Sequence, residues 1–186
     1  MIVLLNGPFG IGKTAAARAL VPLLPDAMVY DPEIIGAFLR RVPGPLGRAE
    51  DYQDLALWRG LTLRLATAIR RLTGRTLVVP MAIPRRDYVE EITGGWRASG
   101  ARIECFRLTA SPATLRARIL GRPDAEGGHA WCLARLEAGL RSAADPAFGV
   151  EIETEGHTPV AIAMRITRLL AAADLDLGRG RVAAGR

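Results

Sequence analysis

Apolar residues follow two alternating patterns along this chain. Short, continuous apolar runs alternate with longer segments in which apolar residues recur every three or four positions. The runs are typical of strands buried on both faces of a sheet, and the periodic segments are typical of amphipathic helices. The runs predict strands at residues 2–6, 27–30, 76–81, 102–108 and 150–154. This alternation predicts an α/β fold with a five-stranded parallel sheet.

The periodic segments predict seven helices. They span residues 13–24, 32–41, 50–72, 85–99, 111–121, 130–143 and 159–171. Three of them begin with a capping residue followed by proline, at Asp31-Pro32, Ser111-Pro112 and Thr158-Pro159. The third helix carries an apolar stripe at helical spacing, formed by Leu61, Leu65, Ala68 and Leu72. Such a stripe predicts the face of the helix that packs in the core.

Three segments interrupt the regular pattern. Residues 42–47 contain two prolines and two glycines, which excludes a helix or a central strand. Residues 121–128 are polar and glycine-rich between two helices, and we expect them to form a mobile lid. From about Ala173 to residue 186 the chain is rich in small and basic residues, and we expect it to form a disordered tail. The sequence therefore predicts one domain over residues 1–172.

Composition and charge agree with a single domain that binds a small anion. The chain has 186 residues, of which 49% are hydrophobic, enough for one core. Its net charge of +6 comes from scattered arginines without runs of like charge, so the pattern does not favour binding to nucleic acid. Cys105 and Cys132 are too isolated for a disulfide framework or a metal site, and we expect a cytoplasmic protein.

A phosphate-binding loop follows the first predicted strand. It reads Gly7, Pro8, Phe9, Gly10, Ile11, Gly12, Lys13 and Thr14, which matches G-x-x-x-x-G-K-[ST]. In such a loop the glycines let backbone N–H groups surround nucleotide phosphates, and the lysine reaches the β- and γ-phosphates. Lys13 is the only lysine of the chain, so an otherwise arginine-rich composition has kept an ammonium here. We expect all eight residues to bind ATP, with the Thr14 hydroxyl as a Mg²⁺ ligand.

Other residues narrow the class of phosphate-binding protein. A guanine-specific GTPase needs an Asn-Lys-x-Asp element, which the absence of a second lysine excludes, and the chain is too small for a transporter-type ATPase. A small kinase remains, in which arginines beside a lid neutralise charge on the transferred phosphoryl group. We assign this catalytic role to Arg118 and Arg122, whereas Arg116 is expected mainly to solvate its helix.

Asp31 is the expected catalytic carboxylate. It ends the second predicted strand, at the edge where open α/β sheets bind ligands. There it could accept the proton of a substrate hydroxyl or hold Mg²⁺ through water, and it also caps the helix that begins at Pro32. The third strand and its following residues, 76–83, end without a carboxylate. Mg²⁺ would therefore depend on Thr14, phosphate oxygens and water, with Asp31 as a further candidate.

These residues resemble the tunicamycin-resistance ATP-binding proteins, which are similar to chloramphenicol phosphotransferase, shikimate kinase and nucleoside monophosphate kinases. The resemblance covers residues 2–170. It is carried by residues 5–14, 29–33, 51–53, 57–59, 79–83, 110–111, 114–115, 118, 122 and 131. Many proteins share the phosphate loop, but the Tyr-Asp-Pro-Glu, Leu-Trp-Arg and Val-Pro-Met segments in this order are more specific. The resemblance implies resistance to a nucleoside antibiotic that contains uracil, sugars and a fatty acyl chain.

The acceptor side is expected around the start of the third helix. Trp58 could stack on a base or sugar and Arg59 could hold an anion or carbonyl, with core packing as the alternative for Trp58. Asp51, Tyr52 and Gln53 could donate or accept hydrogen bonds, with capping of the helix as the alternative.

The sequence thus predicts a cytoplasmic, Mg²⁺-ATP-dependent phosphotransferase that acts on a small molecule. Its fold is expected to be that of nucleotide kinases, with strand order 2-3-1-4-5, helices on both faces and a short lid. The principal alternative is an ATP-binding protein that sequesters the antibiotic at a membrane surface without phosphorylating it. A housekeeping small-molecule kinase is a third interpretation. The oligomeric state is left open.

Overall fold

Five parallel strands form the sheet in the order β2-β3-β1-β4-β5. The computed structural model describes residues 1–44, 48–124 and 128–183, with side chains as far as residue 175. The strands are β1 (Ile2–Asn6), β2 (Ala27–Val29), β3 (Thr76–Met81), β4 (Ile103–Thr109) and β5 (Val150–Glu153). Both the strand positions and their predicted order are confirmed.

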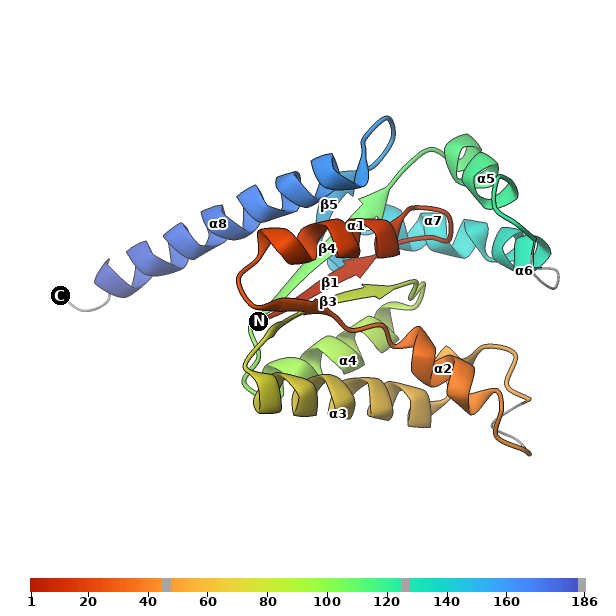
Figure 1. Ribbon diagram of the computed structural model, residues 1–186, viewed down its shortest axis with the longest axis horizontal. Coiled ribbons are helices and arrows are strands. Elements are labelled where there is room, and N and C mark those ends of the chain that lie inside the picture. Colours follow the sequence, from red (N-terminus) through yellow and green to blue (C-terminus); the bar gives the residue numbers. More distant parts are fainter. Residues whose placement is uncertain (45–47, 125–127, 184–186) are drawn as a thin grey trace.

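Helices connect successive strands and cover both faces of the sheet (Figure 1). The α-helices are α1 (Lys13–Leu20), α2 (Glu33–Leu39), α3 (Ala56–Thr73), α4 (Arg86–Ala98), α5 (Pro112–Leu120), α6 (Gly128–Ala134), α7 (Leu136–Ala144) and α8 (Pro159–Ala183). Short 3₁₀ turns are η1 (Val21–Leu23), η2 (Tyr52–Asp54) and η3 (Pro146–Phe148). None of the described helices is long and apolar enough to cross a bilayer.

The two faces of the sheet have separate apolar cores because successive side chains of a strand point to opposite faces. Val3 and Leu5 pack in the cluster that α1 and α8 cover. Ile2 and Leu4 pack in the cluster that α3 and α4 cover. Helices α5, α6 and α7 lie at the end of the sheet to which the strand arrows point in Figure 1. The fold therefore leaves the carboxyl ends of the strands for a ligand site.

Four predicted helices have different ends in the structure. Helix α1 stops at Leu20 and continues as the η1 turn around Pro22, and the predicted helix 50–72 begins with η2, which Asp51 caps through a bond from Gln53 N. The predicted helix 130–143 is divided into α6 and α7 by Arg135. Helix α8 extends to Ala183 instead of ending at residue 171, and an ion pair between Arg102 and Asp174 attaches this extension to the sheet.

The face that α3 buries is not the face that the sequence predicted. Its buried residues are Trp58, Thr62 and Ala66, whereas Leu65 and Leu72 are 42% and 86% exposed. The bulky Trp58 fills the space near α2, and the smaller Thr62 and Ala66 let the helix lie close to the sheet. Periodicity located an apolar stripe correctly but could not show that Leu65, Ala68 and Leu72 face solvent while Leu61 packs partly against the core.

A buried side chain fixes the end of β1, where the phosphate loop begins. Asn6 Nδ2 donates to the Ile83 carbonyl, and Asn6 Oδ1 accepts from Ile83 N, both at 2.9 Å. Asn6 is 1% exposed and Ile83 is 1% exposed, so water cannot replace these bonds. The pair holds the segment after β3 against the start of the loop.

We expect Asn6→Ala to lower the free energy of unfolding by about 2–4 kcal/mol, because it leaves both backbone groups of Ile83 buried without partners. Urea unfolding monitored by circular dichroism measures the change. Thr167→Ala, which removes a hydroxyl bonded within α8 to Ala163 O, serves as the control with a much smaller effect. Equal unfolding midpoints for the two variants would contradict this account of Asn6.

Candidate functional site

The phosphate loop joins β1 to α1 and folds around an open volume. Gly10 and Gly12 have φ angles of 83° and 95°, a region that side chains disfavour. A Cβ atom at Gly10 would lie 3.0 Å from the Leu115 carbonyl oxygen, so the loop also packs directly on α5. The first N–H groups of α1 have no partners within the helix and form, with its dipole, a site for an anion.

Lys13 lies beneath this loop and is 8% exposed. Its ammonium donates to the carbonyls of Gly7 and Pro8, both at 2.9 Å, and lies 5.4 Å from the centre of the Phe9 ring. Burial lowers the pKa of Lys13 to about 8, although the negative charge of Glu33 acts in the opposite direction. The ammonium is therefore held at the loop by neutral carbonyls, and an anion would compensate its charge.

A cavity of about 370 Å³ surrounds the loop and the start of α1. It is lined by Phe9, Gly10, Gly12, Lys13, Thr14, Ala15, Arg18, Glu33 and Arg122. Three of these side chains are cations, and the Thr14 hydroxyl stands beside them. Backbone N–H groups, an ammonium and a hydroxyl are the groups that hold nucleotide phosphates and their Mg²⁺, so the residues present fit Mg²⁺-ATP. No cluster of three acidic, histidine or cysteine side chains within the described residues offers a separate metal site.

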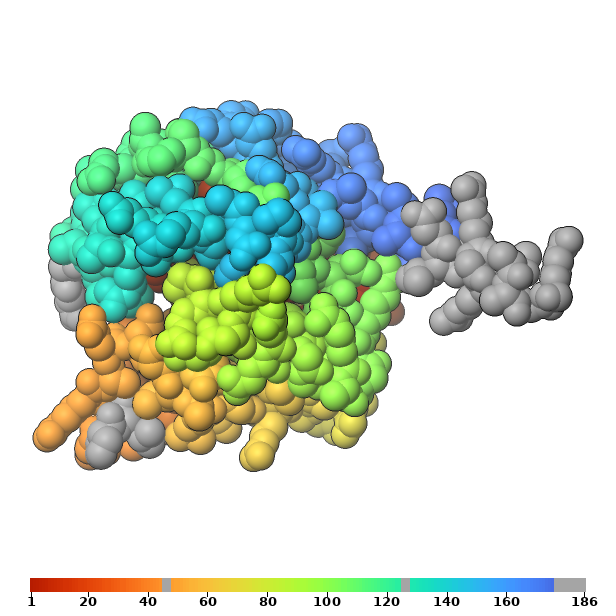
Figure 2. Space-filling view, turned by 180° about the vertical axis from the view of Figure 1, so that it is seen from behind, coloured from red at the N-terminus to blue at the C-terminus, as the bar shows by residue number. Residues whose placement is uncertain are grey.

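A second cavity of about 260 Å³ adjoins the first. It is lined by Phe9, Glu33, Ala37, Arg40, Tyr52 and Trp131. Phe9 and Glu33 belong to both cavities, so the two spaces meet at these side chains. Figure 2 shows the molecule hollowed between the orange residues that follow α2 and the cyan residues of α6 and α7. The second cavity is thus placed for a molecule that receives a group from the first.

Aromatic rings and arginines build the walls of the second cavity. Trp131 from α6 packs edge to face on Phe9 at 5.0 Å, and the guanidinium groups of Arg40 and Arg135 lie 5.9 Å and 4.1 Å from its ring centre. Arg40 also lies 5.1 Å from the ring of Tyr52. Cation–π contacts of this kind hold the walls together across separate elements.

Two carboxylates near the end of β2 have different positions. Asp31 Oδ1 accepts at 3.0 Å from the N–H of Glu33, the first residue of α2, and Asp31 lines neither cavity. Glu33 lines both cavities. Although the residue is exposed, partial burial of its carboxyl raises the pKa of that group while the charge of Lys13 lowers it. The sequence motifs assign no role to Glu33. The available signal is its position in the first turn of α2, where its N–H donates to Asp31.

The two lid arginines also differ. Arg122 lines the first cavity together with Lys13. Arg118 instead donates to the carbonyl and hydroxyl of Thr154, at 3.1 Å and 3.2 Å, and more weakly to the Ile11 carbonyl at 3.4 Å. Arg118 therefore connects the phosphate loop to the end of β5. Part of the predicted lid, residues 125–127, lies outside the described residues.

Trp58 and Arg59 do not line either cavity. Trp58 is 1% exposed and its indole donates to the Pro32 carbonyl at 3.1 Å, which favours core packing over the predicted contact with a substrate. Arg59 pairs with Glu91 at 2.6 Å and donates to the Gln53 carbonyl at 2.7 Å. Its guanidinium is thus engaged by two groups of the protein, which favours a structural role for Arg59.

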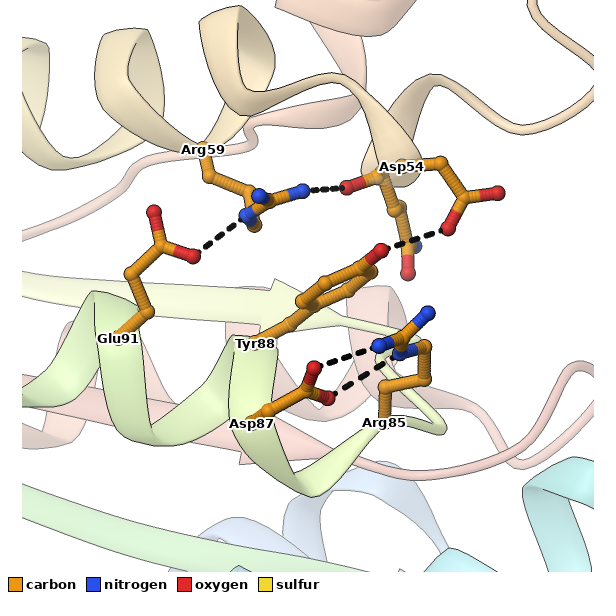
Figure 3. Close-up of polar contacts among 7 residues, drawn as sticks. Asp54, Arg59, Arg85, Asp87, Tyr88 and Glu91 are labelled. Carbon is orange, nitrogen blue, oxygen red and sulfur yellow. Dashed lines mark hydrogen bonds and ion pairs between the residues drawn. The ribbon is translucent and has the colours of Figure 1, made fainter.

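Figure 3 shows the network around Arg59. The Tyr88 ring lies between the guanidinium groups of Arg59 and Arg85, at 4.1 Å and 4.2 Å, and its hydroxyl donates to Asp54 at 2.8 Å. These contacts attach η2 to α4. Since η2 carries Tyr52, a wall of the second cavity, Arg59 contributes to the position of that wall.

The matches to known proteins agree with this geometry. A sequence model of a family described as an AAA domain matches residues 2–146. The chain belongs to this AAA domain family. A comparison with curated proteins gave no match. Among solved structures, this AAA domain is similar to the Deinococcus radiodurans tunicamycin resistance protein, with 28% identity, a TM-score of 0.73, and coverage of 91% of this chain and 94% of that chain.

Kinases from other organisms share the fold of this AAA domain. A sugar kinase from Janibacter is 18% identical with a TM-score of 0.63, and 91% of this chain and 94% of that chain are covered. Shikimate kinase from Acinetobacter baumannii is 17% identical with a TM-score of 0.58, and 94% of each chain is covered. The predicted kinase-type fold is confirmed.

The affinity of the loop for ADP should fall as Lys13 loses its proton. Since the pKa of Lys13 in the free protein is about 8, we expect the affinity to decrease about tenfold per pH unit above that value and to be nearly constant below it. Calorimetric titration with ADP across this range measures the effect. Lys13→Gln should bind ADP weakly without this pH dependence, and parallel profiles for the two proteins would contradict the assignment.

Arg118→Ala and Arg122→Ala should have different effects. Loss of Arg118 removes bonds to buried Thr154, so we expect the free energy of unfolding to fall by about 1–3 kcal/mol. Loss of the exposed Arg122 should leave stability nearly unchanged and slow phosphoryl transfer by roughly 10²-fold. Urea unfolding and a kinase assay separate these effects. Equal stability of the two variants would show that Arg118 does not support the loop.

Proposed function

We propose that this protein is a kinase that transfers the γ-phosphoryl group of ATP to a hydroxyl of a small molecule, and that its acceptor is a nucleoside-type antibiotic such as tunicamycin. The observation that carries the proposal is the junction of the two cavities at Glu33. The first cavity has residues that can bind a nucleoside triphosphate. The second cavity has aromatic walls and is large enough for part of an acceptor molecule. A cytoplasmic location fits such a role.

The residues of the first cavity would hold and polarise the nucleotide. The N–H groups of the loop and the Lys13 ammonium would bind its phosphate oxygens, and the Thr14 hydroxyl would be a ligand of Mg²⁺. ATP supplies the phosphoryl group, and Mg²⁺ neutralises part of its charge. Arg122 lies where its guanidinium can stabilise the charge that develops on the transferred group.

Glu33 is the base that the geometry favours for the acceptor hydroxyl. Its carboxylate faces both cavities, and its raised pKa brings it closer to the value at which a carboxylate accepts a proton effectively. Asp31, bonded to Glu33 N, would act by holding the first turn of α2 and thereby the backbone of Glu33. This assignment moves the base by two residues, from Asp31, which the sequence favoured, to Glu33.

The nature of the acceptor is supported by the walls of the second cavity. Tyr52, Trp131 and Phe9 offer flat faces against which a nucleobase can stack, and Arg40 offers donors for carbonyl or acidic oxygens. The structural similarity to a tunicamycin resistance protein, at 28% identity, supports an antibiotic of that type.

Sequestration of the antibiotic without phosphorylation is the second candidate function. The residues that follow β3, Ala82 and Ile83, carry no carboxylate that could help to hold Mg²⁺. A site with weak Mg²⁺ coordination would bind nucleotide and acceptor while transferring phosphate slowly.

A matched pair of variants tests the proposal. Glu33→Gln and Asp31→Asn each remove one charge and keep the shape of the side chain. We expect Glu33→Gln to reduce the transfer rate by roughly 10²-fold and Asp31→Asn to keep most of the activity, because an amide oxygen still caps α2. The assay measures the mass increase of one phosphate on tunicamycin incubated with protein and Mg²⁺-ATP. Nucleotide titration and circular dichroism serve as controls for binding and folding.

The outcomes distinguish the assignments. A large loss in Asp31→Asn alone would return the role of base to Asp31. Resistance of cells that express the wild-type protein, together with no phosphorylated product from wild type or variants, would establish sequestration in place of phosphoryl transfer.

A further inference from the structure

The outer side of α3 carries exposed leucines. Leu57, Leu65 and Leu72 are 45%, 42% and 86% exposed. The exposed Ala68 and the half-buried Leu61, which also packs against the core, lie between them at spacings of three or four residues, so all five share one side of the helix. In Figure 1, α3 forms the lower edge of the molecule, with the sheet on its other side. Single exposed leucines are common, whereas several on one side of a helix can form a binding surface.

The charges on α3 are all positive. Its 18 residues contain no Asp or Glu, and they contain four arginines. Arg59 and Arg70 are bonded within the protein, to Glu91 and to the Ser99 carbonyl. Arg64 and Arg71 are exposed beside the stripe, and neither pairs with a carboxylate among the described residues. The surface therefore combines apolar area with uncompensated positive charge.

We propose that this face of α3 binds an anionic lipid surface. Leucines that lie along one side of a helix, bordered by arginines, can enter the boundary between acyl chains and headgroups while the guanidinium groups bind phosphates. Charge complementarity selects this occupant. Two copies of α3 packed on each other would bring their arginines together without a carboxylate on either helix, which opposes a dimer through this face.

The orientation that results leaves the site accessible. Helix α3 covers one face of the sheet, whereas the two cavities lie at the carboxyl ends of the strands, where α5, α6 and α7 gather. Binding through α3 would place the sheet above the lipid and the cavities at its side. An acceptor that carries an acyl chain could then reach the protein from the same lipid surface.

Vesicle sedimentation with matched variants tests the proposal. The probes are vesicles of phosphatidylcholine with and without phosphatidylglycerol. Leu65→Gln with Leu72→Gln removes the stripe, and Arg64→Gln with Arg71→Gln removes the free charges. Val160→Gln with Met164→Gln is the control, because these residues of α8 are 57% and 45% exposed on the opposite side of the sheet.

We expect the wild-type protein and the α8 control to bind vesicles that contain phosphatidylglycerol, and to release them as salt is raised. Each α3 double variant should bind these vesicles at least about 10-fold more weakly than the wild-type protein. Its affinity for ADP and its circular dichroism spectrum should be unchanged. Equal binding by the α3 and α8 pairs, or by neutral and anionic vesicles, would overturn the proposal. A concentration-dependent dimer that only the leucine pair abolishes would replace it with self-association. None of these results depends on whether the site transfers phosphate.

Discussion

The packing of the phosphate loop against two helices is the contact on which the site depends. A Cβ atom at Gly139 of α7 would lie 2.7 Å from the Pro8 side chain, and one at Gly10 would lie 3.0 Å from the backbone of α5. These close approaches leave no space for a side chain at either glycine. Arg122, which lines the first cavity, follows α5, and Trp131, which lines the second, precedes α7. The packing of the loop on these two helices therefore helps to position the walls of both cavities.

The buried ammonium explains why the carboxylate of Glu33 belongs to the same site. Moving a charge out of water costs free energy unless an opposite charge or hydrogen bonds compensate it. Lys13 has two carbonyl acceptors and the field of Glu33, and its pKa is still lowered. A bound phosphate would supply the missing compensation. Because Lys13 also lowers the pKa of Glu33, nucleotide bound beside Lys13 would influence the protonation of Glu33.

Much of the fold could be predicted because its signals are local. The β1 run followed by the glycine-rich loop fixed the start of the sheet, and five buried runs gave all five strands within about two residues. The residues of the site were harder to predict from the sequence. Asp31 and Glu33 are both acidic and adjacent to the same edge, and only the geometry of the first turn of α2 shows which one faces the cavities. For Trp58 and the stripe of α3, the decision depended on tertiary packing, because periodicity gives the apolar side of a helix without its direction.

The two cavities are lined by different kinds of group, and this difference bears on how the acceptor specificity of such a fold can change. The phosphate side consists of backbone amides, glycines and one lysine, so few substitutions would preserve it. The second cavity, proposed for the acceptor, is lined by side chains from the loop, α2, η2 and α6. Ring and guanidinium contacts hold them, as do the bonds of Arg59 and Arg135 to η2 and its flank. Substitution of Arg40, Tyr52 or Trp131 would change the shape and charge of the second cavity without disturbing the sheet. A fold that several kinases share can therefore serve a different acceptor through a few side chains.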